Sequence, residues 1–293
     1  MKYCLGTVQF GLNYGIQNNG KPSEDLVNKL LQTALSNNID MLDTAAAYGD
    51  SEIILGKFFA QYSNNKAKVI SKISSDVLNN MDNNDSTSAL RKGIEESLKR
   101  LQVSKLYGLL YHDSRVVDLE DRVNLLIRTK ESNLVEKVGI SIYSPEEALK
   151  AINYNIDIIQ VPYNIFDDRL SKVGFFAKAK EKNIEIYARS PLLQGLALMD
   201  YNNLPENVLF AKTYVKKFDD ICRKYSVDRL FAAVNYVASN EYIDYIVFGV
   251  DNMDQLQQYL SIRDGDLPKK FIEEIKNEFN EVPEKLVNPV LWK

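Results

Sequence analysis

The 293-residue sequence predicts an α/β protein with a TIM (β/α)8 barrel, a single domain over residues 1–293, and a C-terminal tail and helix near the barrel mouth. Two observations favour this class. Apolar runs rich in β-branched residues alternate with amphipathic segments along the whole chain, as in parallel βα units. No linker rich in Pro, Gly or Ser divides the chain, and such a barrel commonly takes about 250 residues as one domain.

The apolar runs predict eight strands, each rich in Val, Ile, Leu or Tyr. They cover residues 2–7, 39–45, 67–73, 106–112, 136–142, 156–161, 184–189 and 244–249. The expected helices cover residues 24–37, 51–62, 86–101, 119–132, 145–153, 168–182, 209–239 and 253–262, and the tail carries another at 268–281. Leu90, Ile94 and Leu98 recur on one stripe, which is typical of a helix that packs on a barrel. Ser23 and Ser144 precede two of these helices as N-caps.

Composition favours a globular enzyme whose partner is a small molecule. Hydrophobic residues make up 45% of the chain and charged residues 26%, near globular averages. No apolar run reaches the length of a membrane span and the start lacks a signal peptide, so we expect a cytoplasmic protein with no membrane partner. Acidic residues outnumber basic ones, 40 to 36, and this formal charge of −4 disfavours nucleic-acid binding. The oligomeric state is not indicated.

The two cysteines, Cys4 and Cys222, predict neither a disulfide framework nor a metal site. They lack C-x-x-C spacing and have no Cys/His ligand spacing around them. We therefore expect buried thiols and no structural zinc.

Four side chains suited to proton chemistry lie at or just after the ends of neighbouring apolar runs. Asp43, Lys72 and His112, the only histidine, each end such a run, and Tyr48 follows Asp43 closely. The carboxyl ends of barrel strands meet at one mouth, so the four side chains should converge there. Each residue alone has an ordinary explanation, since aspartates form turns, lysines are solvated, tyrosines pack and a histidine is often satisfied under a loop. Together and in order they indicate a site.

This set of residues suits the reduction of a carbonyl. A tyrosine with an ordinary pKa near about 10 needs tuning before it donates a proton at neutral pH. The Lys72 ammonium would stabilise the phenolate, and the Asp43 carboxylate would hold that ammonium in place. His112 would hydrogen-bond the substrate oxygen and orient the carbonyl.

The residues around this set resemble the aldo-keto reductase family. Its signature is matched by Asp43-Thr44-Ala45, Tyr48-Gly49, Ser51-Glu52 and Leu55-Gly56. Further blocks follow in the family's order: Ser71-Lys72, His112, Gly139-Ile140-Ser141, Gln160, Tyr163-Asn164, Ser190-Pro191-Leu192, Gly195 and Phe248-Gly249. The resemblance implies an NAD(P)-dependent oxidoreductase in which Tyr48 is the general acid/base and the nicotinamide delivers the hydride.

The resemblance also implies a cofactor site, with departures at two positions. Ser141 and Gln160 match residues that hold the nicotinamide carboxamide, but Ile142 stands where Asn is usual. Arg189 replaces a stacking aromatic, and its planar guanidinium can also stack. No Gly-x-Gly-x-x-Gly motif follows a strand, which disfavours a Rossmann domain. The candidate cofactor residues are Thr7, Ser141, Gln160, Arg189, Ser190, Leu192, Gln194, Gly195, Gly249, Val250, Asp251 and Gln255.

Cofactor choice depends on the residues after the last strand. Many reductases of this family carry Lys or Arg there for the 2′-phosphate of NADPH, whereas this chain carries Asp251 and Asp254. A carboxylate would repel that phosphate and accept a hydrogen bond from a ribose hydroxyl. We therefore expect NAD(H) to be used at least as well as NADP(H). The alternative is that Asp251 only caps the last helix.

The substrate pocket is expected at the barrel mouth, with Asn13, Tyr14, Arg115 and Trp292 as candidate residues. The hydroxyls, amides and aromatics there suit a sugar or a nucleotide-linked sugar. Residues 6–15 also resemble a branch of the family that often accompanies carbohydrate-modifying enzymes. Trp292, the only tryptophan, alternatively pins the tail onto the barrel.

The sequence leaves two other functions open. One is a Schiff-base aldolase or lyase with Lys72 as nucleophile, which needs no nicotinamide. The other is a catalytically impaired barrel that acts as a binding protein, in keeping with Ile142 and the missing basic clamp. Binding of NADH or NADPH separates a reductase from both.

Overall fold

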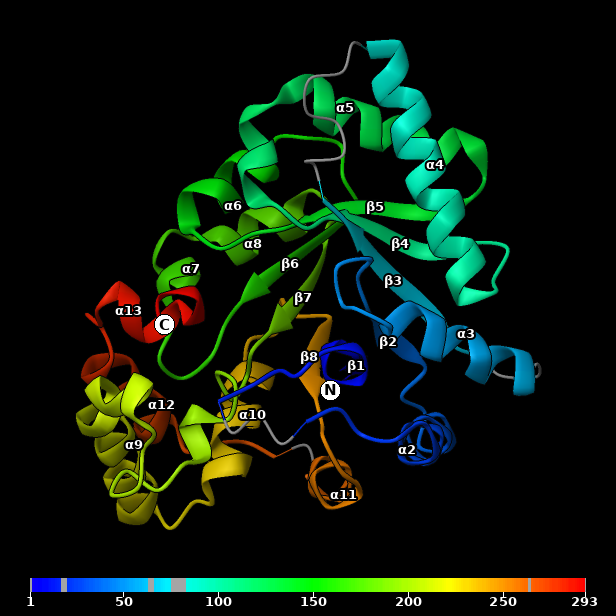
Figure 1. The fold of residues 1–293 in the computed structure, drawn as a ribbon. Coiled ribbons are helices and arrows are strands. Elements are labelled where there is room, and N and C mark those ends of the chain that lie inside the picture. Colours follow the sequence, from blue (N-terminus) through cyan, green and yellow to red (C-terminus); the bar gives the residue numbers. More distant parts are fainter. Residues whose placement is uncertain (1, 17–19, 63–65, 75–82, 263–264, 293) are drawn as a thin grey trace.

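The computed structural model describes residues 2–16, 20–62, 66–74, 83–262 and 265–292. Eight parallel strands close into a barrel in chain order, with β8 paired to β1, and Figure 1 shows helices around the outside. The strands are β1 (Tyr3–Gly6), β2 (Met41–Asp43), β3 (Lys68–Ile73), β4 (Leu106–Tyr111), β5 (Val135–Ser141), β6 (Ile158–Pro162), β7 (Glu185–Arg189) and β8 (Tyr245–Gly249). The predicted TIM barrel is confirmed.

The longer helices agree with the sequence prediction except where left-handed residues interrupt them, and the short helices Val8–Gly11 and Glu284–Val287 were not predicted. The predicted helix over 168–182 is divided before Gly174, at φ +65°, and the one over 209–239 at Ser226, at φ +53°. Ser144 begins α6 with the reciprocal capping box that it forms with Glu147. The α-helices are α1 (Val8–Gly11), α2 (Glu24–Ser36), α3 (Ser51–Gln61), α4 (Asn83–Leu101), α5 (Glu120–Arg128), α6 (Pro145–Ala151), α7 (Arg169–Lys172), α8 (Phe175–Glu181), α9 (Lys212–Tyr225), α10 (Arg229–Ala238), α11 (Met253–Ser261), α12 (Lys269–Glu278) and α13 (Glu284–Val287).

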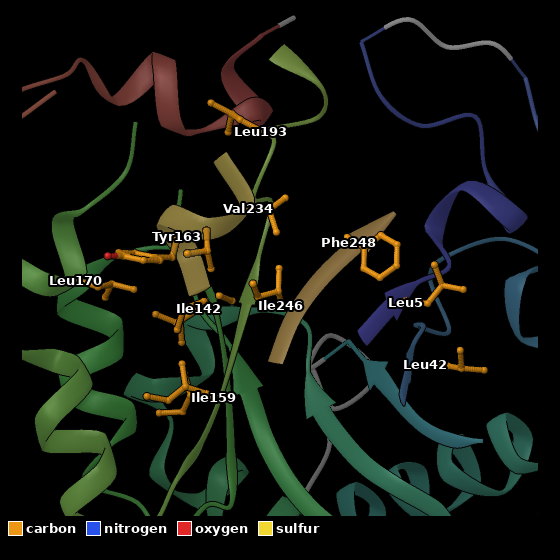
Figure 2. Close-up of a cluster of buried hydrophobic side chains, with 14 of the residues drawn as sticks. Leu5, Leu42, Ile142, Ile159, Tyr163, Leu170, Leu193, Val234, Ile246 and Phe248 are labelled. Atoms are coloured by element: carbon orange, nitrogen blue, oxygen red, sulfur yellow. The ribbon is translucent and has the colours of Figure 1, made fainter. Parts of the chain in front are cut away.

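Successive strand residues point alternately into the barrel and out toward the helices. The inward layer at mid-height is apolar and contains Cys4, Met41, Ile70, Leu110, Ile158, Tyr187 and Val247. Outward residues such as Leu5, Leu42 and Phe248 belong to the larger core beneath the helices, part of which Figure 2 shows. Positions two residues after the inward layer therefore point into the barrel just above it.

The end of the barrel opposite the mouth is closed by charged and aromatic side chains. Lys137 Nζ lies 2.5 Å from Glu185 Oε1 and 2.8 Å from the Tyr107 hydroxyl. The Tyr107 hydroxyl donates to Glu185, and Tyr187 stacks on Tyr245 with ring centroids 4.6 Å apart. We call Tyr107, Lys137, Glu185 and Tyr245 the basal cluster, and Tyr187 of the apolar layer packs on it. The cluster covers the apolar layer on the side where the strands begin.

The tail after β8 returns toward the mouth. In Figure 1, α12 lies beside α9 and α13 lies near the C-terminus. Trp292 is only 5% exposed, and its ring Nε1 donates to the Lys285 carbonyl at 2.6 Å. The ring also approaches Phe210, with centroids 6.5 Å apart. Trp292 therefore holds the end of the tail against the body of the protein.

Both cysteines, Cys4 and Cys222, are free and buried, as predicted. Within the described ranges, no group of three or more His, Cys, Asp or Glu side chains is arranged to hold a metal ion. No helix in that part of the chain is both long enough and apolar enough to cross a bilayer.

Candidate active site

One layer above the apolar layer, every strand directs one residue toward the barrel mouth. These residues are Gly6, Asp43, Lys72, His112, Ser141, Gln160, Arg189 and Gly249, each within two residues of the end of its strand. All except Lys72 line a cavity of about 600 Å³, a usual size for a ligand pocket. The structure thus brings the predicted Asp43, Lys72 and His112 together at one mouth.

A buried ion pair between Lys72 and Asp43 lies at the centre of this layer. Lys72 Nζ donates to the two carboxylate oxygens at 2.7 and 2.6 Å and to the Thr44 carbonyl at 3.1 Å. Gln160 Nε2 donates to the same carboxylate at 2.7 Å. Burial alone would lower the pKa of the ammonium, but the Asp43 carboxylate and the neighbouring Tyr48 together outweigh this effect, and the pKa of Lys72 is raised. Lys72 is therefore an ammonium ion at neutral pH.

Tyr48 lies against this ion pair. Its hydroxyl oxygen is 3.5 Å from Lys72 Nζ, and its ring centroid is 5.0 Å from the same nitrogen. Burial raises the pKa of Tyr48, and the Lys72 charge lowers it only in part. The Lys72 charge acts in the predicted direction, but desolvation is the larger effect, so the pKa of Tyr48 as a whole is raised. At neutral pH the phenol therefore keeps its proton.

His112 packs edge-on against Tyr48, with ring centroids 5.5 Å apart. Burial, followed by repulsion from the Lys72 charge, lowers the pKa of His112 to about 4. The ring is therefore neutral at physiological pH. A neutral imidazole has one N–H donor and one acceptor nitrogen.

A backbone contact that requires glycine holds the Tyr48 loop against α1. A Cβ at Gly11 would lie 1.7 Å from the Tyr48 carbonyl oxygen, and a Cβ at Gly49 would lie 2.5 Å from the Gly11 carbonyl oxygen. Gly49 also has a φ of +54°, in the left-handed region that glycine adopts without strain. The two glycines thus set the position of Tyr48. The sequence alone does not reveal this, because Gly11 and Gly49 are far apart along the chain.

Hydroxyl groups brace the same loop from below. Ser51 Oγ lies 2.7 Å from Thr7 Oγ1 and 2.9 Å from Thr44 Oγ1, and it donates to the Thr7 carbonyl at 2.9 Å. Thr7 Oγ1 donates in turn to the Asp43 carbonyl at 3.0 Å. Thr7 borders the cavity but is fully buried, so its hydroxyl group serves this network.

The sequence matches a family of known proteins. Residues 2–278 match the Aldo/keto reductase family. The chain belongs to that family. Among its relatives, the protein named Uncharacterized oxidoreductase YrpG of Bacillus subtilis (strain 168) is 25% identical over 311 aligned positions, which cover 95% of this chain and 92% of YrpG. Aldo-keto reductase YhdN of the same organism is 26% identical over 213 positions, 70% of this chain and 62% of YhdN.

A solved structure shows the same fold. The thermostable aldo-keto reductase Tm1743, crystallised with the inhibitor epalrestat, superposes with a TM-score of 0.69 at 19% identity, over 94% of each chain. Aldo/keto reductases use NAD(P)H, so this chain is an NAD(P)-dependent oxidoreductase.

In this aldo/keto reductase the connection after β7 has an unusual backbone. Ser190, Leu193 and Gln194 have φ values of +61°, +48° and +56°, followed by Gly195 at +89°. Each non-glycine residue in this region costs about 1–2 kcal/mol, so the surroundings must hold the loop in shape. Gln194 Nε2 donates to the Tyr14 hydroxyl at 3.2 Å. The predicted cofactor residues Ser190, Leu192, Gln194 and Gly195 all line the cavity.

At the end of β8, the reductase places Gly249, Asp251 and Gln255 on the cavity wall. Val250 is fully buried and is not among the described residues that line the cavity. The N-cap of α11 is Asn252, whose side chain accepts from the Gln255 N–H at 2.9 Å. The alternative in which Asp251 caps this helix is therefore wrong. Burial raises the pKa of the half-buried Asp251 carboxyl.

Gln9 is a cavity residue that the sequence analysis missed. Its Oε1 is buried and has no hydrogen-bond partner among the described residues. Its amide lies over Gly249, where a Cβ would come within 2.4 Å of it. A buried amide oxygen without a partner costs free energy unless a ligand satisfies it. This end of the cavity therefore fits a polar ligand such as a nucleotide cofactor.

Arg189 stacks on a second missed residue, Tyr143. The guanidinium carbon lies 4.4 Å from the Tyr143 ring centroid, and Nη2 donates to the Ile142 carbonyl at 3.2 Å. The Ile142 side chain lies in the outer core, as Figure 2 shows, whereas Ser141 and Tyr143 line the cavity. Ile142 thus contributes its backbone to the site.

Of the four predicted substrate residues, only Tyr14 lines the cavity. Asn13 is exposed beside it. The Arg115 side chain is 79% exposed and forms an ion pair with Asp113. Neither Arg115 nor its partner Asp113 lines the cavity. The ion pair with Asp113 thus holds the Arg115 side chain at the surface.

The tail borders the cavity through other residues than predicted. Trp292 is not part of the described cavity wall, because its ring is packed beneath the tail. Pro289 and Val290 line the cavity instead, and Val290 is 60% exposed. Which face of a short turn meets the cavity depends on tertiary packing.

Proposed function

We propose that this chain interconverts a carbonyl and an alcohol, with Tyr48 as the general acid/base. The observation that carries the proposal is the buried Lys72–Asp43 pair, whose ammonium lies 3.5 Å from the Tyr48 hydroxyl. A phenol that loses its proton beside a fixed ammonium gains a charge-assisted hydrogen bond. The phenolate is stabilised as it forms, which is the condition for lowering a reaction barrier.

In the reduction direction, the Tyr48 O–H bond breaks as the O–H bond of the product alcohol forms. The raised pKa of Tyr48 keeps the phenol protonated before the reaction. Lys72 then stabilises the phenolate, and Asp43 keeps the ammonium in place. When bound, the nicotinamide supplies the hydride that adds to the carbonyl carbon. In the oxidation direction, the Tyr48 phenolate takes the proton from the alcohol.

We assign His112 the role of a hydrogen-bonding group for the substrate oxygen. It lines the cavity beside Tyr48, and its low pKa keeps the ring neutral. A charged imidazole would compete with Tyr48 as proton donor. A neutral ring orients the carbonyl without that competition.

The predicted cofactor residues fit a nicotinamide nucleotide. The amide nitrogen of Gln160 donates to Asp43, so its amide oxygen can accept a hydrogen bond from the N–H of the nicotinamide carboxamide. Ser141 also lines the cavity. At the other end, the partnerless oxygen of Gln9 lies next to Gly249. We propose that the loop over residues 190–195 and the end of the cavity near Gln9 and Gly249 hold the diphosphate and ribose of the cofactor.

We propose that the chain uses NAD(H) at least as well as NADP(H). Asp251 lines the cavity, and Arg189, the last residue of β7, is the sole Lys or Arg among the described lining residues. Dissociation constants of NADH and NADPH, measured by nucleotide fluorescence, test this. A tenfold preference for NADPH, about 1.4 kcal/mol, would contradict it. Asp251→Ser should improve NADPH binding more than NADH binding.

For the substrate, we propose a sugar or a nucleotide-linked sugar, which also suggests a role in carbohydrate metabolism. The support is a cavity of about 600 Å³ whose wall offers the Tyr14 hydroxyl together with the aromatic rings of Tyr48 and Tyr143. A screen of sugar aldehydes and nucleotide sugars with both coenzymes tests this. Faster turnover of apolar aldehydes than of every sugar would contradict it.

Substitution of Tyr48 tests the proton donor. Tyr48→Phe should lower kcat by about 10³-fold, because general acid catalysis is lost, while NADH binding is kept. Tyr225→Phe is the matched control, since that hydroxyl bonds to Glu274 on the surface helices. Parent-like turnover by Tyr48→Phe would remove Tyr48 from its assigned role.

The two alternative functions have less support. A Schiff base needs a neutral amine, whereas the pKa of Lys72 is raised and its side chain is 1% exposed. The impaired-barrel alternative depended on Ile142 and on the missing basic clamp. The Ile142 side chain lies in the core, while Ser141 and Gln160 still reach the cavity, and the missing clamp bears on the choice between NADH and NADPH. Borohydride trapping of a carbonyl on Lys72 would restore the first alternative.

A further inference from the structure

Arg189 carries a positive charge into the cavity, and no carboxylate of the described residues forms an ion pair with it. Its Nη2 donates a hydrogen bond to the Ile142 carbonyl at 3.2 Å. A guanidinium is always charged and has five N–H donors. Most of its hydrogen-bonding capacity is therefore available to a ligand.

The two carboxylates of the cavity wall do not neutralise this charge. Asp43 is occupied by Lys72 and Gln160. Asp251 follows β8 and bonds through its backbone to Gln255. The whole chain carries a formal charge of −4, so attraction of an anion here is a local property of Arg189.

Tyr143 fixes the plane of the guanidinium. The guanidinium carbon lies 4.4 Å from the centroid of the Tyr143 ring, which is a cation–π contact. The ring covers one face, and Tyr143 itself is 40% exposed at the mouth. A guanidinium held in this way is ready to bind a carboxylate or phosphate through two parallel hydrogen bonds.

Arg189 lies close to the reacting groups. It belongs to the same inward layer as His112 and Gln160, one residue per strand. Burial raises the pKa of Tyr14 and Tyr48, and the Arg189 charge opposes part of that rise. Burial lowers the pKa of His112, and the Arg189 charge adds to that effect, so its field covers this part of the cavity. An anion bound to Arg189 would therefore be carried by the same small molecule whose carbonyl faces Tyr48.

We infer that Arg189, held by Tyr143, binds the carboxylate or phosphate of an anionic carbonyl substrate. The protein is thus selective for negatively charged aldehydes or ketones over neutral ones. This inference rests on the proposed carbonyl–alcohol function and adds the charge of the substrate to it. Arg189 is a specificity-determining residue for that reaction.

Matched substrate pairs test the inference. Glyceraldehyde 3-phosphate is compared with glyceraldehyde, and 4-carboxybenzaldehyde with 4-formylbenzamide, as the ratio of kcat/KM between the anionic and the neutral member. We expect the parent ratio to exceed about ten in at least one pair, equivalent to about 1.4 kcal/mol. In Arg189→Gln the ratio should fall about tenfold, mainly through KM of the anionic member. Arg189→Lys should give an intermediate ratio, because the charge remains but the planar fork is lost.

Variants of the neighbours separate binding from general disturbance. Tyr143→Phe keeps the ring and should keep the ratio, whereas Tyr143→Ala should lower it. Arg91→Gln is the control for loss of a positive charge, since Arg91 pairs with Glu95 on the surface of α4. A fall in the ratio as large in Arg91→Gln as in Arg189→Gln would overturn the inference.

The cofactor is the other possible source of the anion, and its binding is measured directly. If Arg189→Gln weakens NADH and NADPH tenfold and leaves the substrate ratio unchanged, the anion belongs to the cofactor and the inference is overturned. A parent ratio near one in both pairs also overturns it, while carbonyl reduction itself stands.

If no carbonyl is reduced, the proposed function fails, and calorimetry decides the inference separately. The probes are 4-(hydroxymethyl)benzoate and its neutral amide, titrated into the parent and Arg189→Gln. Tighter binding of the carboxylate that is lost in the variant supports the anion site. Equal binding of the two probes overturns it.

Discussion

At neutral pH the active site contains an ammonium on Lys72, a neutral ring on His112 and a protonated phenol on Tyr48. The carboxylate of Asp43 maintains the first state, and burial maintains the other two. Neighbouring groups whose environments move their pKa values apart are the usual basis of acid–base assignments. Among these three, Tyr48 carries the proton that a fixed cation helps to release.

The pKa of His112 predicts the acid limb of the pH profile. We expect kcat/KM to be constant near neutral pH and to fall only as the ring protonates, near pH 4. Since this pKa is below its ordinary value of 6.5, the unfolded chain binds the proton more tightly between the two values. The free energy of unfolding should therefore also fall as the pH drops from 6.5 to 4.

Steady-state rates and urea unfolding across this pH range provide the measurement. His112→Asn should lack the acid limb and react about 10²-fold more slowly, because a hydrogen bond to the substrate oxygen is lost. An acid limb centred at pH 6.5 in the parent would mean that His112 is not desolvated as described.

The Lys72–Asp43 pair predicts strong coupling in stability. Lys72→Met and Asp43→Asn should each cost about 3–5 kcal/mol of unfolding free energy, because each leaves a buried charge without its partner. The double variant should cost much less than the sum. Urea unfolding of the four proteins gives the coupling energy. Simple additivity would show that the pair does not act as a unit.

At the scale of elements, the position of Tyr48 depends on contacts between segments distant in the sequence. The loop after β2 meets α1 through Gly11 and Gly49, and Ser51 at the start of α3 bonds to Thr7. Three elements thus converge on one catalytic candidate. A family signature that spans residues 43–56 is therefore in part a signature for packing.

Gly11→Ala should impair turnover without touching the cavity. Its Cβ would lie 1.7 Å from the Tyr48 carbonyl, so the loop must shift. A displacement near 1 Å costs about 10² in rate, which we expect as a lower kcat. Gly93→Ala is the control, because its Cβ meets only the end of the Ile73 side chain. Equal kcat in both variants would contradict this account.

Element prediction succeeded where the signal was local. Hydrophobic periodicity located the strands, and Ser23 and Ser144 began helices as N-caps. It failed where one residue in a left-handed conformation ended a helix, as at Ser226, because a polar side chain there carries no distinctive pattern. Boundaries of this kind depend on tertiary packing.

At the scale of the whole molecule, the barrel separates the mouth from the basal cluster. The inward apolar layer lies between them. In TIM barrels the strand-start end serves stability and the strand-end mouth serves chemistry. Changes in the basal cluster should therefore alter stability alone.

Glu185→Gln tests this separation. Loss of the partner of Lys137 and Tyr107 should cost about 1–2 kcal/mol, less than for a fully buried pair because both charged side chains are 26% exposed. We expect kcat/KM to stay within about twofold, since Glu185 is outside the site. Glu95→Gln breaks an exposed pair as the control and should cost under about 0.5 kcal/mol. Urea unfolding and steady-state kinetics on each variant decide the point.

The barrel and the set of Asp43, Lys72 and His112 were predictable because each depends on residue order and strand ends. Gln9 and Tyr143 were not, since a residue joins the cavity wall only when the strands curve and close. The direction of the Tyr48 pKa depended on burial, which a sequence does not specify. The sequence allowed Trp292 either to line the pocket or to hold the tail against the barrel. The packing of its ring in the structure shows that it holds the tail.

The apolar layer also determines the route by which Tyr48 regains its proton after each reaction. Its members Cys4, Met41, Ile70 and Leu110 offer no side chain suited to proton relay at neutral pH, and the hydroxyl of Tyr187 bonds to Glu185 at the opposite end of the barrel. Hydrogen ions lost from Tyr48 must therefore come back from bulk water by way of the opening above. A ligand that fills this opening keeps water from Tyr48 until the ligand leaves. Reprotonation of Tyr48 should therefore coincide with release of the product.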